Sequence, residues 1–461
     1  MRWLDHKRRI AVTGLAGSGK TVFLLSLLQH MEYFRHDRFP IVGGDDAAIS
    51  EFREIKNNGK FAAFPRSRLR AGLMARQDIN WPAKTCDIYQ YRCSFNYNQL
   101  GLTTRMYNTF RNLVKSASLM SERVEWDILD FPGERLSDSL AAKHQDFAEW
   151  SDELLEQFET SEHLQGEMQE YLDLLQKGGS PVDATIIAVY KKCLTRIVHK
   201  KYQLITPSTF MLDKDGARIF SAEDLENSGI DRVSGLAGAE FSPLPAEFRN
   251  AEPLVAARFA DNYGKYREEV VLPLFNAINS CDTLLVLLDI PNILSGGVGR
   301  LNDTKHLLET LALSITPSNW FFTNVDKAAF IASKSDMVHD DDLDRLWALT
   351  EELMQDFLRR QTRLSRECEA FTVSAWVSSK STTLKDGSHA LQAMPARGFT
   401  GQMPEEPPTF RVPPLPAEWP EDDWESTGYP RLMPPRLANK SSVPRQRNLE
   451  KIFDFIMRGK K

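Results

Sequence analysis

Short runs of apolar residues recur along the chain, and polar residues follow most of them. Short apolar runs bounded by turn-forming residues predict buried strands, whereas a longer pattern with a 3.6-residue period predicts a helix. In an open α/β sheet, ligands collect at the carboxyl ends of the strands, so the residues just beyond the runs are the place to seek chemistry. The predicted strands lie at residues 9–13, 89–95, 126–129, 283–288, 320–322 and 371–373.

The interval between Gly133 and the run at residues 283–288 is much longer than one crossover helix requires. Residues 186–199 inside it read as a helix. A second helix is predicted because apolar side chains recur at the helical spacing of i, i+3, i+7 and i+11. Those side chains are Phe147, Trp150, Leu154 and Phe158. The interval therefore predicts an inserted, mostly α-helical subdomain.

The last part of the chain changes character, because prolines crowd residues 394–444. Proline blocks regular helices and central strands, so an extended excursion is predicted there. A closing helix is predicted at residues 449–457, with Leu449, Ile452, Phe453 and Ile456 on one stripe. Interleaved aromatic residues predict that the proline-rich segment packs on the body of the protein, and these are Phe399, Phe410, Trp419, Trp424 and Tyr429.

These patterns together predict a division of the chain into three units. A discontinuous core contains the predicted strands, and a long amphipathic helix at residues 343–357 belongs to its outer layer. The predicted limits are 1–135 and 270–393 for the core, 136–269 for the inserted helical subdomain, and 394–461 for the proline-rich extension and closing helix packed on the core.

Composition narrows the class of protein. With 461 residues, of which 42% are hydrophobic, the chain can bury a large core and carry an inserted unit. Its net charge of −6 argues against a general nucleic-acid-binding surface, which needs an excess of Lys and Arg. The five cysteines are scattered without a CxxC pair, so neither a disulfide framework nor a zinc site is indicated. Without an apolar signal region or a spanning apolar run, a cytoplasmic location is expected.

The strongest chemical signal is the segment GLAGSGKT at residues 14–21, which lies between a predicted strand and a predicted helix at 22–31. Its glycines let consecutive backbone N–H groups curl around an anion at a helix N-terminus. Lys20 is expected to reach the β- and γ-phosphates, and Thr21 to ligate magnesium. The segment therefore predicts a P-loop nucleoside triphosphatase. Its expected nucleotide-binding residues are Gly14, Ala16, Gly17, Ser18, Gly19, Lys20, Thr21 and Val22.

A second phosphate-site element is the Asp-x-Pro-Gly segment that begins at Asp130, at the end of a predicted strand. Beside a P-loop, Asp130 is the expected carboxylate of the magnesium site, and the Gly133 N–H is placed to sense a γ-phosphate. Asp289 is a rival carboxylate, because it also ends an apolar run. Asp130 is preferred, since only Asp130 is followed by the glycine.

Two polar segments follow later strands, where a base-reading loop should lie. Thr323-Asn324-Val325-Asp326 follows residues 320–322, and Ser374-Ala375 follows residues 371–373. A carboxylate at Asp326 can accept hydrogen bonds from both N1–H and N2–H of guanine, whereas adenine offers no such donor pair. This favours GTP over ATP. The base-reading residues predicted here are Asn324, Asp326, Ser374, Ala375 and Trp376.

On these motifs the core resembles the Ras-like GTPases, and the whole chain more closely resembles the bacterial YcjX-like family of stress-associated P-loop proteins. The second resemblance also takes in WPAKTCDI at residues 81–88, the helical insertion and the proline-rich region. It implies an α/β fold with a Ras-like P-loop sheet flanked by helices, GTP or GDP and Mg²⁺ as cofactors, and a role in a bacterial stress response. An unidentified protein partner, through which the chain would reach the inner membrane peripherally, is also expected.

The chain departs from the Ras-like pattern at two positions. The base-reading motif normally has lysine where Asn324 stands, so the stem that packs over the base would be lost and guanine affinity reduced. Glu134 stands where Ras-like enzymes keep a water-orienting glutamine. A carboxylate there repels the γ-phosphate unless it is protonated or paired, for instance with Arg135, so slow intrinsic turnover is expected. Glu134 is either a general base or only occupies the position.

Thr85 is the predicted switch threonine that closes over magnesium, because it precedes the second strand where the resemblance requires it. Thr103 and Thr104 are the alternatives. With Lys20 and Glu134, Thr85 completes the predicted catalytic set, and with Thr21 and Asp130 it completes the predicted metal set.

Two other readings of function stay open on the sequence. One is an ATPase with a chaperone-like role and an unspecific base site, and the other is a scaffold that holds a structural nucleotide. The predicted helix of the insertion is also basic, which suits either an acidic partner or lipid surface, or a solvated helix face. Its basic residues are Lys191, Lys192, Arg196, His199, Lys200 and Lys201.

Overall fold

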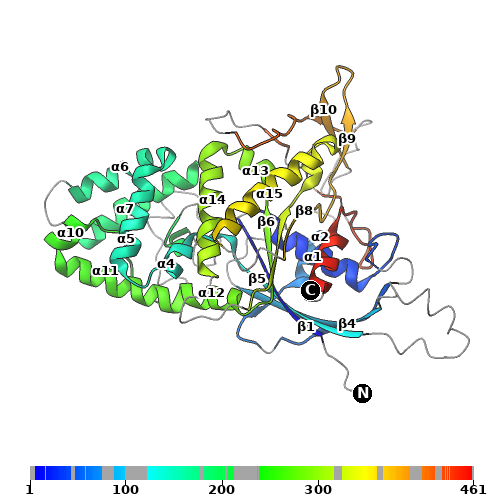
Figure 1. Cartoon of the computed structure of the whole chain (residues 1–461), viewed down its shortest axis with the longest axis horizontal. Helices are drawn as coiled ribbons and strands as arrows, with labels where there is room; N and C mark the ends of the chain where they lie inside the picture. Colours follow the sequence, from blue (N-terminus) through cyan, green and yellow to red (C-terminus); the bar gives the residue numbers. More distant parts are fainter. Residues whose placement is uncertain are drawn as a thin grey trace, which may run out of the picture.

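A mixed β-sheet flanked by helices forms the centre of the molecule (Figure 1). The structure is a computed structural model, and it describes residues 6–15, 17–42, 47–57, 59–74, 88–98, 122–176, 181–200, 202, 205–211, 236, 238–315, 324–360, 367–394, 407–420, 428–430, 432, 434–435 and 437–458. Within these residues the central sheet has eight strands in the order β2-β4-β5-β1-β6-β7-β8, with β3 paired to β4. The strands are β1 (His6–Gly14), β2 (Ala48–Ile55), β3 (Ala62–Ala63), β4 (Tyr89–Asn98), β5 (Glu122–Asp130), β6 (Thr283–Leu288), β7 (Lys327–Ala332) and β8 (Cys368–Thr372).

The five strands β1, β5, β6, β7 and β8 are parallel, so their carboxyl ends meet at one edge of the sheet, called here the carboxyl edge. The register aligns Val12 with Asp130 and Gly14 with Leu287. Strand β4 runs antiparallel to β5, and β2 antiparallel to β4. Loops that follow the parallel strands therefore lie side by side, which is where an α/β sheet of this kind binds its ligands.

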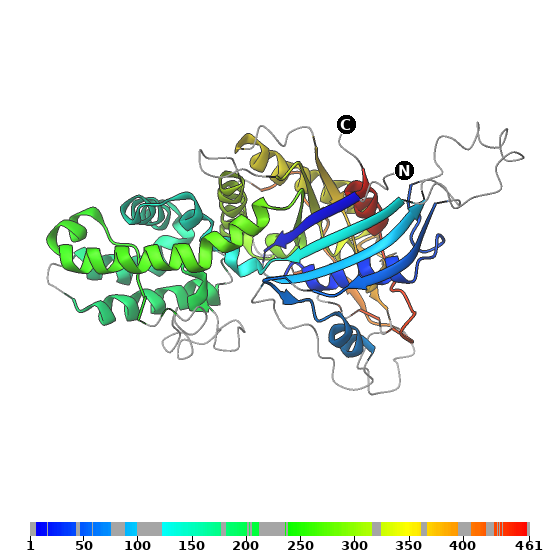
Figure 2. The ribbon, with the colours of Figure 1, turned by 90° about the horizontal axis from the view of Figure 1, so that it is seen from below.

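Different helices cover the two faces of the sheet (Figures 1 and 2). Successive side chains of a strand point to opposite faces. In β1, Ile10 and Val12 belong to the apolar cluster of α1 and α16, whereas Ala11 belongs to the cluster of the helices on the other face. The covering helices are α1 (Lys20–Glu32), α2 (Arg66–Met74) and α16 (Leu449–Met457) near one face, and α12 (Leu272–Asn279), α13 (Ile290–Leu294), α14 (Gly297–Ser314) and α15 (Leu343–Arg360) near the other.

A group of helices inserted between β5 and β6 projects away from one end of the sheet in both views (Figures 1 and 2). Helix α5 begins where the Asp146 side chain accepts hydrogen bonds from the N–H groups of Ala148 and Glu149, and it buries the predicted apolar stripe. This helical arm contains α4 (Ser139–Lys143), α5 (Phe147–Thr160), α6 (Glu162–Gln176), α7 (Asp183–His199), α10 (Ala246–Ala251) and α11 (Pro253–Tyr266), and the π-helix Arg267–Val271 leads from it to α12.

The C-terminal region first forms a small antiparallel sheet, with β9 (Ser379–Thr383), β10 (His389–Ala393) and β11 (Thr409–Arg411). Trp419 then lies buried, and its indole N–H donates to the carbonyl of Leu349 at 3.0 Å. In α16, Phe453 contacts the rings of Phe95 and Trp126. The chain end therefore packs on the core through Trp419 and α16. Among the aromatic residues from which packing of the proline-rich segment is predicted, Phe410 is exposed, and Phe399 and Trp424 lie outside the described residues.

The fold predicted from the sequence is confirmed as an α/β sheet flanked by helices. The closing helix has the predicted limits, and the predicted helices of the insertion are present as α5 and α7. One strand differs. The predicted strand at 320–322 lies outside the described residues, and the strand that pairs with β6 is β7, which begins at Lys327. The predicted domain limits stay a prediction.

Candidate functional site

The glycine-rich loop leaves β1 at the carboxyl edge and enters α1 at Lys20. Gly14 has a φ of +139°, and a β-carbon there would lie 2.2 Å from the carbonyl oxygen of Leu287, so only glycine fits. The loop then tightens through a hydrogen bond from Ser18 N–H to the Leu15 carbonyl at 3.1 Å. Thr21 and Val22 lie in the first turn of α1, and the predicted residue Ala16 lies outside the described residues.

The Lys20 ammonium is buried inside this loop. It donates to the carbonyl oxygens of Gly14 at 2.9 Å and Leu15 at 3.2 Å. Burial lowers the pKa of Lys20, while the negative charges of Glu134 and Asp130 act in the opposite direction. The ammonium of Lys20 can bind a phosphate, and a nearby carboxylate can bind a metal ion. A phosphate that carries a metal ion would therefore meet a group of opposite charge for each of its parts.

The end of β5 brings the Asp-x-Pro-Gly segment against the glycine loop. Asp130 is fully buried beside Val12, and the next residue, Phe131, donates its N–H to the Val12 carbonyl at 2.9 Å. A β-carbon on Gly133 would lie 2.3 Å from the Gly14 carbonyl oxygen and 2.7 Å from Lys20 Nζ. Only a glycine permits this approach. The structure thus brings Asp130, Gly133 and the P-loop together.

The structure contradicts the prediction that Asn324 and Asp326 read the base. Both residues precede β7, so they lie at the amino edge of the sheet, opposite the P-loop. Asp326 donates its N–H to the Asp282 carbonyl, and Asn324 donates to that of Asn279, both before β6. The six residues of β7 separate this edge from the carboxyl edge by roughly 16 Å, because a strand rises about 3.3 Å per residue.

The loop after β7, Ser333-Lys334-Ser335-Asp336, lies instead at the carboxyl edge, where a base-reading segment is expected. Lys334 Nζ donates to the carbonyl of Gly17 at 2.8 Å, so its stem lies over the P-loop. The sequence analysis missed this segment because the preceding run, KAAFIA, contains three small alanines and looks less apolar than the residues around 320. The lysine two places before an aspartate was the signal that could have found it.

Asp336 is buried and held from two sides. One carboxylate oxygen accepts from Ser374 Oγ at 2.7 Å, and the other accepts from Ser378 N–H at 2.7 Å. Ser374 and Ala375 follow β8, so the loops after β7 and β8 meet at the carboxyl edge. The carboxylate is therefore fixed in orientation and retains lone pairs for further donors.

The other residues predicted after β8 have structural contacts. The Trp376 indole is buried and donates to the Pro435 carbonyl at 3.0 Å, which leaves its backbone as the part able to meet a ligand. The Ala375 carbonyl accepts from Ser26 Oγ of α1. The loop after β8 is thus attached both to the C-terminal segment and to the helix that begins at the P-loop.

Asp289, the rival carboxylate, follows β6 and faces Lys334. Their side chains form an ion pair at 2.5 Å, and the other Asp289 oxygen accepts from Asn292 N–H at the start of α13. Asp289 thus positions Lys334 and caps α13. The preference for Asp130 at the metal position stays a prediction.

Glu134 is the second residue of the 3₁₀ helix η3 (Gly133–Asp138), and the end of this helix is attached to the helical arm. The Asp138 carboxylate is buried and accepts from Thr206 Oγ1 at 3.1 Å, from Ser208 N–H at 2.9 Å and from Tyr266 OH at 2.7 Å. Burial raises the pKa of Asp138, while these hydrogen bonds act in the opposite direction. The phosphate-side loop and the helical arm therefore share one buried polar junction.

The predicted switch residue Thr85 and its alternatives Thr103 and Thr104 lie outside the described residues. Among the predicted basic residues in and just after α7, Lys201 lies outside the described residues, and carboxylates of neighbouring segments pair with several of the others. Glu170 of α6 binds Lys192 and Arg196, and Glu167 binds Lys200. Lys191 binds Glu240 at 2.7 Å. This pairing favours the solvated, structural interpretation of the basic helix over a lipid-binding one.

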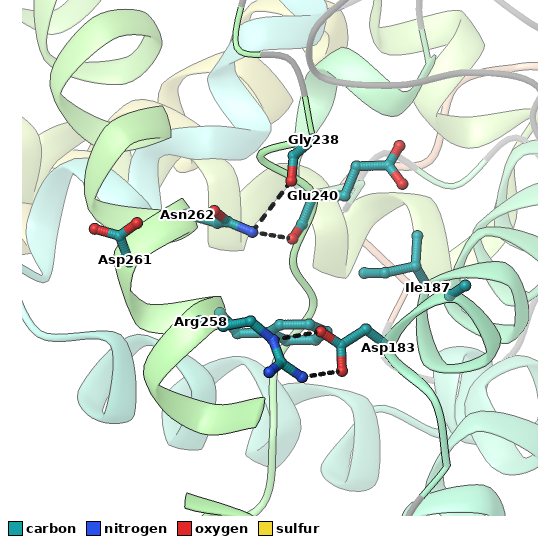
Figure 3. A pocket seen from close by; sticks show the side chains of 9 residues that line it. Asp183, Ile187, Gly238, Glu240, Arg258, Asp261 and Asn262 are labelled. Atoms are coloured by element: carbon teal, nitrogen blue, oxygen red, sulfur yellow. Dashed lines mark hydrogen bonds and ion pairs between the residues drawn. The ribbon is translucent and has the colours of Figure 1, made fainter. Parts of the chain in front are cut away.

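A cavity of about 380 Å³ lies in the helical arm, away from the P-loop (Figure 3). The bidentate ion pair of Asp183 with Arg258 has both distances at 2.8 Å. Asn262 donates to the Glu240 carbonyl at 2.8 Å (Figure 3). The polar residues that line this cavity thus mainly hold α7, α11 and the chain near Gly238 together.

Comparisons with known proteins agree on one family. A model of the YcjX-like family matches residues 8–460. A protein of Escherichia coli (strain K12) named Ras-like GTPase YcjX is 25% identical, over 77% of this chain and 75% of its own length. A protein of Shewanella oneidensis with the same name is 23% identical, over 93% of this chain and 89% of its own length. None of the helices described here is long and apolar enough to cross a membrane.

Proposed function

Because this chain belongs to the YcjX-like family, we propose that it is a Mg²⁺-dependent, GTP-binding and GTP-hydrolysing switch of the Ras-like type. The observation that carries the proposal is the pair Lys334 and Asp336 beside the P-loop. Asp336 presents a fixed carboxylate, which suits the two adjacent donors N1–H and N2–H of guanine. Lys334 bridges this loop to Gly17, which supports the proposal that one nucleotide contacts both segments.

The phosphates fit the glycine loop on structural grounds. Gly17 and Gly19 have positive φ angles of +80° and +85°, a conformation that glycine favours and that lets a loop curl its N–H groups around an anion at the start of α1. Lys20 is the cation for the phosphates. Thr21 and Asp130 supply a hydroxyl and a carboxylate, which are oxygen donors of the kind Mg²⁺ prefers, and the metal supplies charge neutralisation. Thr85 is proposed as a further magnesium ligand and switch residue.

Slow intrinsic turnover follows from Glu134, which stands directly after Gly133 and acts on the charge of Lys20. A carboxylate near a γ-phosphate opposes both binding and in-line attack, because catalysis of this reaction depends on positioning and on stabilising negative charge. An activating partner that neutralises Glu134 or moves η3 would raise the rate.

The buried junction at Asp138 would transmit a change at the nucleotide to the helical arm. Residues Gly133 and Asp138 are the two ends of η3, so a γ-phosphate that moves Gly133 also pulls on the hydrogen bonds to Ser208 and Tyr266. The helical arm would then change its position with the state of the nucleotide. We extend this proposal to a cytoplasmic role in a stress response through a protein partner, as the family resemblance implies.

The test of guanine recognition is a change of base preference. Asp336→Asn exchanges an acceptor for a group that can also donate, so the variant should lose GTP affinity and gain affinity for xanthosine triphosphate, whose O2 accepts. Asp326→Asn is the matched control at the amino edge and should leave both affinities unchanged. Fluorescent-nucleotide competition with GTP, ATP and xanthosine triphosphate measures this. Equal binding of GTP and ATP by the unmodified protein would support an ATPase instead. Tight GTP retention without phosphate release, with or without cell extract, would support a scaffold.

A further inference from the structure

Two histidines from distant parts of the chain stack against each other beyond the base-reading loop. His339 lies between Asp336 and α15, and His389 begins β10 of the small C-terminal sheet. Their ring centroids are 4.0 Å apart, and the rings are nearly parallel at 11°. His339 is buried and His389 half-buried, so the pair is built into the fold and is open on one side only.

Asp341 adds a carboxylate to this pair. Its Oδ2 lies 3.3 Å from Nδ1 of His339 and 3.5 Å from Nε2 of His389. The three ligand atoms all lie within 4.8 Å of one another. The Asp341 side chain is 70% exposed, which leaves a path to solvent.

These separations are long for hydrogen bonds, which have their usual range at about 2.7–3.2 Å. They match the edges of a metal site. For bonds of about 2.0–2.1 Å, tetrahedral geometry places neighbouring ligand atoms about 3.3 Å apart. The nearly parallel rings have to leave their stack before both nitrogen lone pairs can point at one ion, and rotation about χ2, a torsion that is soft in histidine, contributes to this change. Nδ1 of His339 would give up its long, 3.3 Å hydrogen bond from Asp341 N–H.

A second carboxylate lies behind His389. Asp342 is buried, and its Oδ2 is 3.4 Å from Nδ1 of His389, while its other oxygen binds Arg345 at 3.1 Å. A histidine that ligates a metal usually donates its other ring N–H to a carboxylate, which fixes the tautomer and the ring orientation. Asp342 is in the position to do this, so Nε2 of His389 is left free to face Asp341.

The turn that carries Asp341 is held in place by its neighbour. Asp340 donates its N–H to Ser381 Oγ of β9 at 3.0 Å, and its carboxylate binds Arg447 at 2.6 Å. Ligands from two segments are therefore held together by contacts that do not depend on an ion. Such preorganisation lowers the entropy that metal binding would otherwise cost.

We propose that His339, Asp341 and His389 form a binding site for a divalent transition-metal ion of the zinc class. Two imidazoles and one carboxylate suit Zn²⁺, Co²⁺, Ni²⁺ or Cu²⁺, whereas Mg²⁺ prefers oxygen ligands and belongs at the P-loop. The site leaves a fourth position open toward solvent. An ion bound there joins β10 to the segment that follows Asp336, and so attaches the small sheet to the base-reading loop.

Equilibrium dialysis of the chelator-stripped full-length protein against Zn²⁺, in excess Mg²⁺ and with elemental analysis, tests the proposal. The unmodified protein should retain one equivalent of Zn²⁺. His389→Ala and Asp341→Asn, which change half-buried and exposed side chains, should each weaken binding by about 10-fold or more. The controls are His199→Ala, which removes an exposed histidine of α7, and Asp344→Asn, which changes an exposed aspartate just past the proposed site in α15. Both should bind Zn²⁺ as the unmodified protein does.

Substitution with Co²⁺ supplies an independent signature, because a tetrahedral site gives intense visible absorption that octahedral Co²⁺ lacks. The absorption should be present in the unmodified protein and both controls, and lost in His389→Ala. Absence of Zn²⁺ retention by the unmodified protein would overturn the proposal. Equal retention by His389→Ala and Asp341→Asn, with circular dichroism showing that they are folded, would overturn it as well. Neither result depends on GTP binding, so the nucleotide proposal is tested separately.

Discussion

Two aspartates flank the same strand, and they differ in what they can do. Asp326 precedes β7 at the amino edge of the sheet, where its backbone bonds to the residue before β6. Asp336 follows β7 at the carboxyl edge, where two donors orient its carboxylate beside the P-loop. Both segments resemble a base-reading motif as strings of letters. The difference shows that such a motif can serve a ligand site only when it follows the carboxyl end of its strand.

The same contrast holds for lysines. Lys20 and Lys334 lie at the carboxyl edge and contact the P-loop backbone. Lys327 begins β7 at the other edge, and its ammonium donates to the carbonyls of Phe455, Ile456 and Arg458 at the end of α16. The two lysines at the carboxyl edge lie where a ligand would bind. Lys327, at the amino edge, instead caps the C-terminus of α16 by binding its last carbonyl groups.

The largest effect is expected from Lys20→Ala. Nucleotide affinity should fall by about 100-fold or more, because removing one member of a desolvated charge pair costs about 3 kcal/mol. Lys327→Met is the matched variant at the amino edge and should keep nucleotide affinity while lowering stability. Isothermal titration with GTP, and thermal melts of both variants, separate the two roles. An unchanged affinity in a folded Lys20→Ala protein would contradict the site.

Lys334→Ala should have a smaller effect, a loss of GTP affinity of about 10-fold. The variant loses the contact with Gly17 and leaves Asp289 without its ion pair, but it retains the P-loop itself. Stopped-flow release of a fluorescent guanine nucleotide should show a faster dissociation rate. If dissociation is unchanged while Asp336→Asn still alters base preference, Lys334 supports the loop without contacting the nucleotide.

Glu134→Gln should raise GTP affinity by about fivefold, since about 1 kcal/mol of like-charge repulsion is removed. Hydrolysis should be held or increased, because a glutamine orients water without the charge. Single-turnover hydrolysis at saturating GTP is the measurement. A fall in turnover of about 100-fold would instead identify Glu134 as the general base. An unchanged rate together with unchanged affinity would mean that Glu134 points away from the nucleotide.

The smallest effect is expected from Asp454 of α16. Its carboxylate accepts a hydrogen bond from Val42 N–H and has no role in the proposed nucleotide site. Burial raises its pKa to about 6. At pH 7 the folded protein therefore holds a destabilised carboxylate, and Asp454→Asn should raise the free energy of unfolding by about 1 kcal/mol. The gain should shrink as pH falls from about 6 toward 4, where the folded wild-type protein is already protonated. Urea unfolding at pH 7 and pH 4.5 checks this, with GTP affinity unchanged.

Local patterns predicted the parts of the fold that depend on local physics. The P-loop signature requires a strand before it and a helix after it, and the apolar stripes of α5 and α16 fix their own faces. Even the end of β5 at Asp130 could be placed, because the Asp-x-Pro-Gly turn follows the short run Trp126-Asp127-Ile128-Leu129, which is apolar except for Asp127. For each of these elements the local sequence is compatible with only one structure.

The loop after β7 could not be identified from the sequence, because only strand pairing shows which segment forms this strand. Residues 320–322 are aromatic and apolar, so they resemble a strand more than the alanines of β7 do. The alanines are nevertheless buried, in a strand that pairs with β6 on one side and β8 on the other. The histidine cluster could not be predicted from the sequence either. His339 and His389 lie fifty positions apart and meet only because the small C-terminal sheet brings them together.

The C-terminal helix has a consequence for how the protein is made. Phe453 covers Phe95 and Trp126, and the segment before α16 bonds to Gln29 and His30 of the first helix. One face of the central sheet is thus closed by residues that lie far along the chain from the P-loop. During synthesis the P-loop strand emerges early, and that face stays uncovered until α16 has emerged. A premature stop just before α16 would release a protein that contains the P-loop and the segments after β5, β7 and β8 and yet has an open core.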